Sequence, residues 1–151
     1  MNGKKIAVFC ATAALVLFAD QGIKALLRTY PEGTVIFKGR ILEIVSIRNS
    51  GAAFGMLAEQ PFFLISLGGI LLLLVLFSAW KVFSSHERVW AALLFGGALG
   101  NLMDRAVFGQ VTDYIHVYGF SVFNLADICI TLSCAALALG VLREKKNGGN
   151  D

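Results

Sequence analysis

Hydrophobic residues in this chain gather in long runs that charged residues seldom interrupt. A helix rises about 1.5 Å per residue and the hydrocarbon core of a bilayer is roughly 30 Å thick, so a spanning helix needs about 20 mostly apolar residues. Four runs meet this requirement, at residues 6–27, 62–83, 89–108 and 120–142. The pattern therefore predicts an all-α integral membrane protein with four transmembrane helices.

The segment between the first two predicted helices, residues 30–60, has a different pattern. Residues 35–37 and 41–47 are rich in β-branched side chains, and Gly33 and Gly39 lie beside them. Short β-branched runs bounded by glycine are typical of strands. We therefore expect a small external β element here that rests on the membrane surface.

The two ends of the chain differ in hydrophobicity. Lys4 and Lys5 precede an apolar run, as in a cleaved export signal, but the run continues past Asp20 to Leu27 and so favours a retained span. Residues 146–151 hold no apolar side chain and are expected to form a disordered cytoplasmic tail. Residues 1–145 then form a single membrane-embedded domain.

Composition supports a membrane protein and excludes other classes. The chain is 57% hydrophobic and 15% charged, with a mean hydropathy of +0.73, which is far more apolar than soluble domains usually are. The net charge is +3, but the 13 Lys and Arg residues are scattered and form no basic stripe, so no nucleic-acid partner is predicted. The cysteines lie inside predicted spans without a CxxC spacing, which indicates packing.

Basic residues indicate which side of the membrane the chain ends occupy, because they favour cytoplasmic flanks. They are divided almost evenly between the two sides of the predicted spans. However, Lys4 with Lys5 and the basic group at residues 143–146 lie immediately beside spans. We therefore expect both termini in the cytoplasm and residues 30–60 outside.

Four aspartates fall in or beside the predicted spans, where an ionised carboxylate costs at least about 2.5 kcal/mol. Asp20 lies in the outer half of the first span and Asp104 near the outer end of the third. Asp113 follows in a predicted loop, and Asp127 lies about two turns into the fourth span. All of them fall near the external face, which indicates one shared polar site.

Asparagines accompany these aspartates. Asn49 precedes the second span, and Asn101 and Asn124 each lie three residues before an aspartate. Residues three apart on a helix share a face, so each amide can orient the neighbouring carboxylate, and Arg105 can neutralise one of the acids. The structural alternative is that each polar residue caps a helix or joins two spans. For Asp127, which lies among apolar residues, we favour a catalytic role over a structural one.

Other candidate chemistries have weaker patterns. Gly96 and Gly100 form a GxxxG spacing, which is typical of close helix packing. His86 and His116 lie in separate loops without an HExxH motif, so neither a metal site nor a cofactor is predicted. No serine or cysteine has an evident base at helical spacing. Carboxylate chemistry is what remains.

Five sequence blocks match a known family in order and in position relative to the spans. They are DQGIK at residues 20–24, RNSGAAFG at 48–55, GGALGNLMDR at 96–105, VTDYI at 111–115 and FNLAD at 123–127. Along nearly its whole length the chain resembles the lipoprotein signal peptidases, also called type II or prolipoprotein signal peptidases. It departs from that family in having Tyr114 where Phe is frequent, and in a short connection at residues 115–121.

The resemblance implies an intramembrane aspartyl endopeptidase of the bacterial inner membrane. Its partners would be membrane lipids and prolipoproteins, which it cuts before a cysteine that carries a diacylglyceryl group. The implied catalytic pair is Asp113 and Asp127, near the periplasmic face, and we expect a monomer. The implied supporting or substrate-binding positions are Asp20, Lys24, Asn49, Gly51, Asn101, Asp104, Arg105, Asn124 and Ala126.

Two close carboxylates cannot both ionise cheaply, so one retains a proton while the other can take one from water. We expect the ionised member to activate water against the scissile carbonyl, and the protonated member to stabilise the oxyanion and protonate the amine. Which aspartate carries the proton is left open by the sequence, because the pair titrates as one unit. Arg48 and Asn49 are placed to meet the substrate backbone or lipid.

Two other functions are compatible with the same polar residues. A small proton-coupled transporter also uses acids on several spans, but a midplane site and internal repeats are expected of it, and the sequence shows neither. A scaffold protein would use the glycines and polar residues only for packing. Retained biological function after Asp127→Asn would indicate the scaffold.

Overall fold

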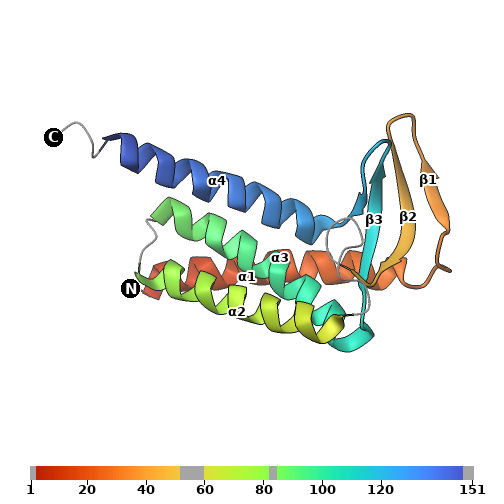
Figure 1. Ribbon diagram of the computed structural model, residues 1–151, viewed down its shortest axis with the longest axis horizontal. Helices are drawn as coiled ribbons and strands as arrows, with labels where there is room; N and C mark the ends of the chain where they lie inside the picture. The colour runs from red at the N-terminus through yellow and green to blue at the C-terminus, as the bar shows by residue number, and fades with distance from the viewer. Residues whose placement is uncertain (1–2, 52–59, 82–84, 148–151) are drawn as a thin grey trace.

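The computed structural model describes residues 3–51, 60–81 and 85–147 of the chain. The helices in these ranges are α1 (Gly3–Leu27), α2 (Pro61–Lys81), α3 (Ser85–Phe108) and α4 (Leu125–Asn147). The strands are β1 (Val35–Lys38), β2 (Leu42–Asn49), β3 (Val111–Val117) and β4 (Val122–Phe123). Figure 1 shows the helices running alongside one another, with the sheet across one end and both chain termini at the other.

The first three helices lie where the hydrophobic runs predicted them. Helix α1 begins three residues before the predicted span 6–27, and α2 and α3 agree with the spans 62–83 and 89–108 to within four residues at each end. Residues 82 and 83 of the second predicted span, and residues 52–55 of the RNSGAAFG block, lie outside the described residues.

Helix α3 is central and contacts α1, α2 and α4. A Cβ added to Gly96 would lie 2.5 Å from the carbonyl oxygen of Ala13 in α1. One added to Gly97 would lie 2.8 Å from the carbonyl oxygen of Ala126 in α4, and Gly100 is equally close to α1. The helix packing predicted from the GxxxG spacing is therefore confirmed, because α3 has no room for side chains at these positions.

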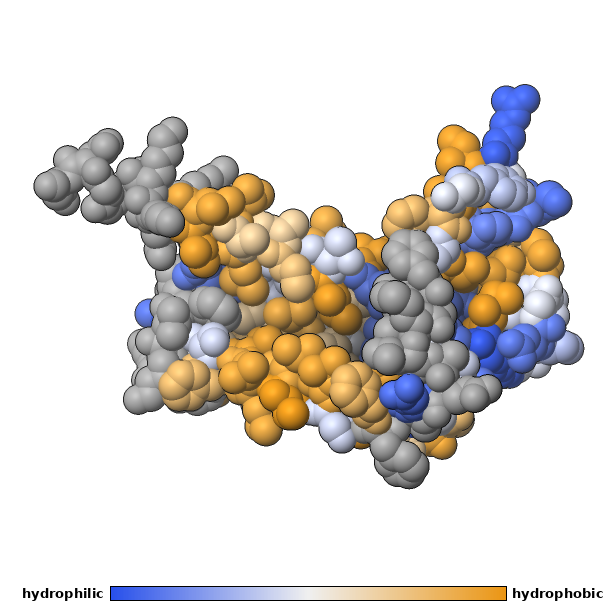
Figure 2. All heavy atoms as spheres, in the orientation of Figure 1, coloured by the Kyte–Doolittle hydropathy of each residue, from blue (hydrophilic) through white to orange (hydrophobic). Residues whose placement is uncertain are grey.

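The outer surface of the helices is apolar, as a membrane protein requires. Among the described residues, the helices Gly3–Leu27 and Leu125–Leu142 are long and apolar enough to cross a membrane, and α2 has a shorter apolar stretch, Phe63–Ala79. Helix α3 is less hydrophobic because its last turns are polar and charged. Two spans rather than four are thus clear from the helices alone. Figure 2 shows hydrophobic side chains over the helices and hydrophilic ones gathering towards the sheet.

The sheet is antiparallel, in the order β1-β2-β3-β4. Strands β1 and β2 lie in residues 30–60, as predicted. Strand β3 lies in a segment that was predicted to be a loop, and β4 lies at the start of the fourth predicted span. Asp113 therefore lies on a strand, where it pairs with Ile47 of β2. The prediction was wrong because β3 depends on a partner strand that precedes it by two whole helices.

The fourth predicted span, residues 120–142, begins too early. Helix α4 begins at Leu125, because Val122 and Phe123 pair with β3 as strand β4. Asp127 consequently lies in the first turn of the helix, not two turns inside it. At its other end α4 extends to Asn147, so the predicted tail is helical at its start, and residues 148–151 lie outside the described part of the chain.

Candidate active site

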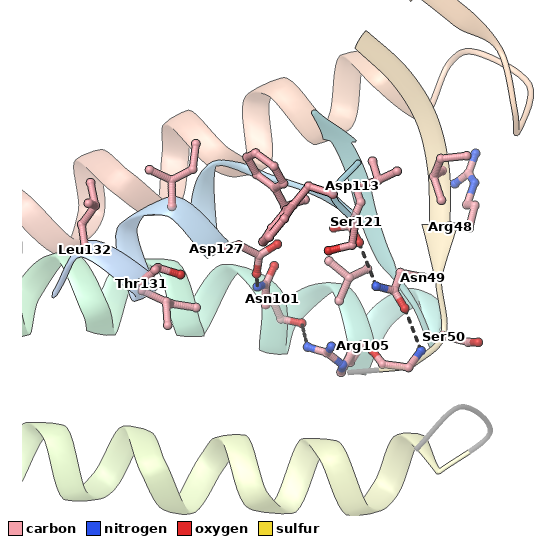
Figure 3. A pocket seen from close by; sticks show the side chains of 18 residues that line it. Arg48, Asn49, Ser50, Asn101, Arg105, Asp113, Ser121, Asp127, Thr131 and Leu132 are labelled. Carbon is pink, nitrogen blue, oxygen red and sulfur yellow. Dashed lines mark hydrogen bonds between the residues drawn. The ribbon is translucent and has the colours of Figure 1, made fainter. Parts of the chain in front are cut away.

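A cavity of about 740 Å³ lies where β2, β3, α3 and α4 meet. Asp113 and Asp127 both line it, together with Asn49, Asn101 and Arg105. Figure 3 shows the two aspartate side chains reaching the cavity from different elements, one from the strand and one from the helix. The cavity thus contains both carboxylates of the predicted pair.

Asp113 is held on β3 with only 3% of its surface exposed. Its Oδ2 accepts a hydrogen bond from Asn49 Nδ2 at 2.9 Å, and its Oδ1 accepts one from Asn124 Nδ2 at 2.7 Å. Burial raises the pKa of this carboxyl to about 6; the charge of Asp127 adds to the rise, and the two amide donors oppose it. A carboxyl with this pKa can hold or release a proton near neutral pH.

Asp127 lies in the first turn of α4 and is more exposed than Asp113. Its Oδ1 accepts a hydrogen bond from Asn101 Nδ2 at 2.8 Å, and its Oδ2 accepts one from the backbone N–H of Asn124 at 3.1 Å. The N–H of Asp127 donates in return to Asn124 Oδ1 at 2.9 Å. This reciprocal pair is a helix-capping arrangement. The predicted association of Asn124 with Asp127 is therefore made through the start of the helix.

The amides beside the aspartates have fixed orientations. Lys24 Nζ lies 2.8 Å from Asn101, and because an ammonium can only donate, the contacting atom must be the amide oxygen. The NH₂ group of Asn101 therefore faces Asp127. In the same way the backbone N–H of Gly51 donates to Asn49 Oδ1 at 2.9 Å and turns that NH₂ group towards its own carboxylate. Both amides thus present donors to the acids.

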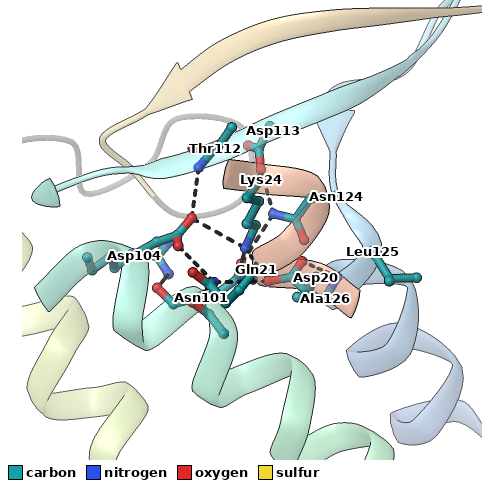
Figure 4. A network of polar contacts seen from close by, with 12 residues as sticks. Asp20, Gln21, Lys24, Asn101, Asp104, Thr112, Asp113, Asn124, Leu125 and Ala126 are labelled. Carbon is teal, nitrogen blue, oxygen red and sulfur yellow. Dashed lines mark hydrogen bonds and ion pairs between the residues drawn. The ribbon is translucent and has the colours of Figure 1, made fainter. Parts of the chain in front are cut away.

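A fully buried ionic cluster joins the helices beside this site. Lys24 Nζ lies 2.8 Å from Asp20 Oδ2 and 3.4 Å from Asp104 Oδ2. Gln21 Nε2 donates to Asp104 Oδ1 at 2.9 Å, and the N–H of Ala126 donates to Asp20 Oδ1 at 3.1 Å. Figure 4 shows these contacts converging from α1, α3 and α4. Because an unpaired buried charge is strongly destabilising, the cluster holds the helices in one arrangement.

Arg105 extends from α3 to the edge of the cavity. Its Nη2 donates to the carbonyl oxygen of Gly51 at 2.9 Å and its Nη1 to that of Asn101 at 3.5 Å. Its Nε is buried and has no hydrogen-bond partner within the described ranges. Arg105 was expected to neutralise one of the acids; its hydrogen bonds go to backbone carbonyls, while its charge interacts with those of Asp127, Asp113 and Asp104.

The structure brings together every residue of the predicted site. The members come from α1, the end of β2 and the turn after it, α3, β3 and the start of α4. They are Asp20, Lys24, Asn49, Gly51, Asn101, Asp104, Arg105, Asp113, Asn124, Ala126 and Asp127.

Sequence reasoning missed three residues that hold this site: Arg28, Thr112 and Tyr114. Arg28 Nε donates to Thr112 Oγ1 at 2.9 Å, and the Tyr114 hydroxyl accepts the N–H of Leu125 at 3.1 Å. Arg28 lies four residues after Lys24 and so one turn further along the same face, a spacing that could have indicated it. The two strand residues had no such signal.

The histidines and cysteines take no part in the site as the structure describes it. His116 lies on β3 with its Nδ1 3.3 Å from Glu43 Oε2, while the side chain of His86 lies outside the described residues. The cysteines are free thiols on α1 and α4. No group of three or more His, Cys, Asp or Glu residues that could hold a metal ion occurs among the described residues.

Comparison with known proteins identifies the family. The family described as signal peptidase (SPase) II matches residues 12–143. The chain belongs to the signal peptidase II family. A lipoprotein signal peptidase of Dehalococcoides mccartyi is 36% identical over 95% of this chain and 94% of that protein. One of Brevibacillus brevis is 34% identical over 89% of this chain and 95% of that protein.

Two solved structures share the fold of this signal peptidase II family member. Both are described as bacterial membrane enzymes determined by the in meso method. One, at 2.3 Å resolution, has a TM-score of 0.88 at 30% identity and covers 100% of this chain and 94% of the other. The second, at 1.9 Å, has a TM-score of 0.80 at 31% identity over 94% of each chain. The family inferred from the five blocks is confirmed, which favours an aspartic-type peptidase over a transporter or a scaffold.

Proposed function

We propose that this protein removes signal peptides from bacterial prolipoproteins, cutting before a cysteine that carries a diacylglyceryl group. The observation that supports this best is the placement of Asp113 and Asp127 on one cavity, each with amide donors at its oxygens. Membership of the signal peptidase II family supplies the reaction class. Lipidated precursors are then the substrate, and no cofactor is required.

In this proposal the more buried Asp113 holds the shared proton when the pair is singly protonated, and Asp127 is the base. Asp113 is the more buried carboxyl, and burial raises its pKa to about 6. Asp127 takes a proton from water while the water oxygen bonds to the scissile carbonyl carbon. Asp113 donates a hydrogen bond to the oxyanion that forms.

The intermediate then collapses with cleavage of the carbon–nitrogen bond. One of the two protonated aspartates transfers its proton to the departing nitrogen of the lipidated cysteine. The other keeps its proton, so the pair returns to its starting charge. One water is consumed, and the products are the carboxyl end of the signal peptide and the free amino group of the cysteine.

Arg105 is the group best suited to bind the substrate backbone near the pair. Its Nε is buried at the cavity without a partner among the described residues, although a guanidinium N–H normally has an acceptor. A carbonyl oxygen of the bound precursor would supply that acceptor once the groups that cover this buried nitrogen move aside. Its other nitrogens, already bound to backbone carbonyls, hold the guanidinium plane in place.

We further infer that all four helices span the inner membrane, that both termini are cytoplasmic and that the site lies near the periplasmic face. Both termini lie at the end of the helices opposite the sheet, which supports this orientation. The protein is proposed to act as a monomer in contact with lipid, and a mass measurement in detergent tests this. Residues 1–145 would then form a single peptidase domain.

Asn49 and Arg48 were both expected to bind the substrate, but the structure gives them different contacts. Asn49 donates to Asp113, so its replacement would disturb the pair as well as any substrate contact. Arg48 lines the cavity, and within the described part of the chain its side chain makes one long hydrogen bond of 3.4 Å, to the carbonyl of Arg28. Arg48→Ala alone is therefore the cleaner test of the grip, and we expect a higher KM at little change in kcat.

The test of the proposed function is cleavage of a purified diacylglyceryl precursor by the purified protein in detergent, with products identified by mass spectrometry. Asp113→Asn and Asp127→Asn keep the shape of the side chain but remove its ionisable oxygen. Each should lower the rate by at least about a hundredfold, the usual range for loss of a general acid or base. Normal cleavage by either variant contradicts the assignment.

The matched control is Glu32→Gln, the same acid-to-amide change at an exposed residue of the turn between α1 and β1. It should cleave at the unaltered rate. A precursor that lacks the diacylglyceryl group should remain uncut by every variant and by the unaltered protein, because the proposed substrate is the lipidated one.

A further inference from the structure

We propose that Arg28 is a positioning residue for Asp113, acting through Thr112 and Asp104. The proposal rests on the proposed function. Arg28 and Thr112 do not line the cavity, so neither is placed to touch substrate. Their effect on the reaction passes through their contacts, which are the strand that holds Asp113 and Asp104 on α3.

The contacts of Arg28 close a ring that joins three elements. Its Nε donates to Thr112 Oγ1 at 2.9 Å, and its Nη2 forms an ion pair with Asp104 Oδ1. The other oxygen of Asp104 accepts the backbone N–H of Thr112 at 3.1 Å. The residue that follows α1, the last turns of α3 and the strand β3 are thereby tied at one point. Figure 4 shows Thr112 joined to Asp104 beside Asp113.

The ring is shielded from solvent and held in one geometry. Asp104 is fully buried, Thr112 is 2% exposed and the Arg28 side chain is 15% exposed. The guanidinium also lies 4.2 Å from the centroid of the Phe108 ring, so it is stacked as well as hydrogen-bonded. Lysine is not an equivalent replacement, because it presents one ammonium in place of the planar fork whose separate nitrogens bind Thr112 and Asp104.

The position of this ring explains why it acts on the catalytic pair. Successive residues of a strand point to opposite faces, so Thr112 is fixed on one face of β3 while Asp113 reaches the cavity from the other. On the cavity side, the side-chain hydrogen bonds that the described residues give Asp113 come from the flexible amide ends of Asn49 and Asn124. The backbone at this point is held by pairing with β2 and, on its other face, by the ring. Catalytic groups misplaced by about 1 Å can lose a hundredfold in rate.

The test compares three substitutions that alter the ring at different points. Thr112→Val keeps the β-branched shape and the backbone N–H but removes the Oγ1 acceptor. Thr112→Ser keeps the hydroxyl, and Arg28→Lys keeps the charge but loses the fork. We expect Thr112→Val and Arg28→Lys each to lower kcat about tenfold with KM within about twofold of the unaltered protein. We expect Thr112→Ser to restore most of the rate.

Two further readouts separate positioning from simple loss of stability. The pH at half-maximal kcat should move in Thr112→Val, because the carboxyls titrate as a pair whose coupling depends on their separation. The double variant Thr112→Val with Arg28→Lys should have a kcat no lower than that of the slower single variant, because both changes break the same ring. Unchanged kcat and pH profile in Thr112→Val, failure of serine to rescue, or additive losses would each overturn the proposal.

A measurement that needs no catalysis distinguishes failure of this inference from failure of the proposed function. Hydrogen exchange followed by mass spectrometry should show faster exchange of residues 111–117 in Thr112→Val and Arg28→Lys, with α4 unchanged. If exchange of residues 111–117 is unaltered in both variants, the ring does not support β3, whatever the activity of the variants. If instead the unaltered protein leaves the lipidated precursor intact while exchange responds as expected, the proposed function fails and the structural role of Arg28 remains.

Discussion

At the scale of single residues, Asn101 determines the environment of one carboxylate of the proposed catalytic pair. Its amide oxygen accepts from Lys24 and its NH₂ group donates to Asp127. The amide cannot turn over without placing its NH₂ group against an ammonium that has no acceptor to offer. Asn101 is consequently a donor to Asp127 in every state of the site, and it stabilises negative charge there.

Asn101→Asp keeps the acceptor for Lys24 but replaces the donor by an oxygen that faces Asp127. Two carboxylates would then oppose each other at neutral pH, and we expect the cleavage rate to fall by at least about tenfold. In acid a proton on the new carboxyl restores a donor, so the rate relative to the unaltered protein should recover as pH falls. A pH–rate profile measures this, and a deficit that is constant across pH contradicts it.

The pKa of Asp113 predicts how stability depends on pH. Burial raises this pKa to about 6 in the folded protein, from an ordinary value of 3.8. The contribution of this raised pKa to stability is fully present below the ordinary value, and about 3 kcal/mol is lost as pH rises from that value through about 6. Asp113→Asn has no such loss.

We therefore expect the melting temperature of Asp113→Asn, minus that of the unaltered protein, to be larger near pH 8 than near pH 5. Thermal unfolding in detergent at the two pH values measures it. Glu32→Gln provides the baseline, because that acid is exposed. If the difference in melting temperature is the same at the two pH values, the raised pKa of Asp113 does not affect stability and the prediction is wrong.

At the scale of elements, the glycines of α3 determine how near α1 and α4 can approach. Gly96→Ala would place a Cβ against a backbone carbonyl of α1, which cannot move aside as a flexible side chain can. We expect a loss of stability of about 1–3 kcal/mol, as for other overpacked sites. Gly69→Ala on α2 is the control, since nothing lies within 4 Å of its Cβ position. Thermal unfolding of the two variants measures the loss. If Gly96→Ala is as stable as Gly69→Ala, the close packing of α3 against α1 is contradicted.

The hydrophobic pattern was sufficient to predict the helices, but it did not predict β3 and β4, the strands that complete the site. Long apolar runs locate α1 to α3, because a membrane helix is defined by its own residues. Strand β3 exists by pairing with β2, and the apolar residues of β4 were read as the beginning of α4 for the same reason. The polar site was nevertheless found, because Asp20, Asp113 and Asp127 are costly in an apolar setting wherever the elements begin.

At the scale of the whole molecule, the polar residues of α3 explain why it is less hydrophobic than a typical span. Asn101, Asp104 and Arg105 face other helices or the cavity, so they are satisfied within the protein. A helix surrounded by others on several sides can cross the membrane with such residues, whereas a lipid-facing one cannot. The number of spans is therefore a property of the assembled helices and requires its own test.

Cysteine labelling from outside the cell tests the proposed topology. The background is a variant in which the native cysteines Cys10, Cys129 and Cys134 are replaced by alanine. In spheroplasts with an intact inner membrane, Glu32→Cys in this background should react with a membrane-impermeant thiol reagent. Gly3→Cys should react only after the inner membrane is permeabilised. The reverse pattern shows the opposite orientation, and equal reactivity of both sites in intact spheroplasts shows that α1 does not cross the membrane.

The hydrogen bond from the N–H of Ala126 to Asp20 connects the beginning of the chain with its last helix. During synthesis the early helices enter the bilayer while the partner of that buried aspartate is still unmade. Proteolytic competence thus arrives only at the final stage of biogenesis. A chain that stops before the last helix lacks both this hydrogen bond and Asp127, so we expect it to cut no neighbouring membrane protein.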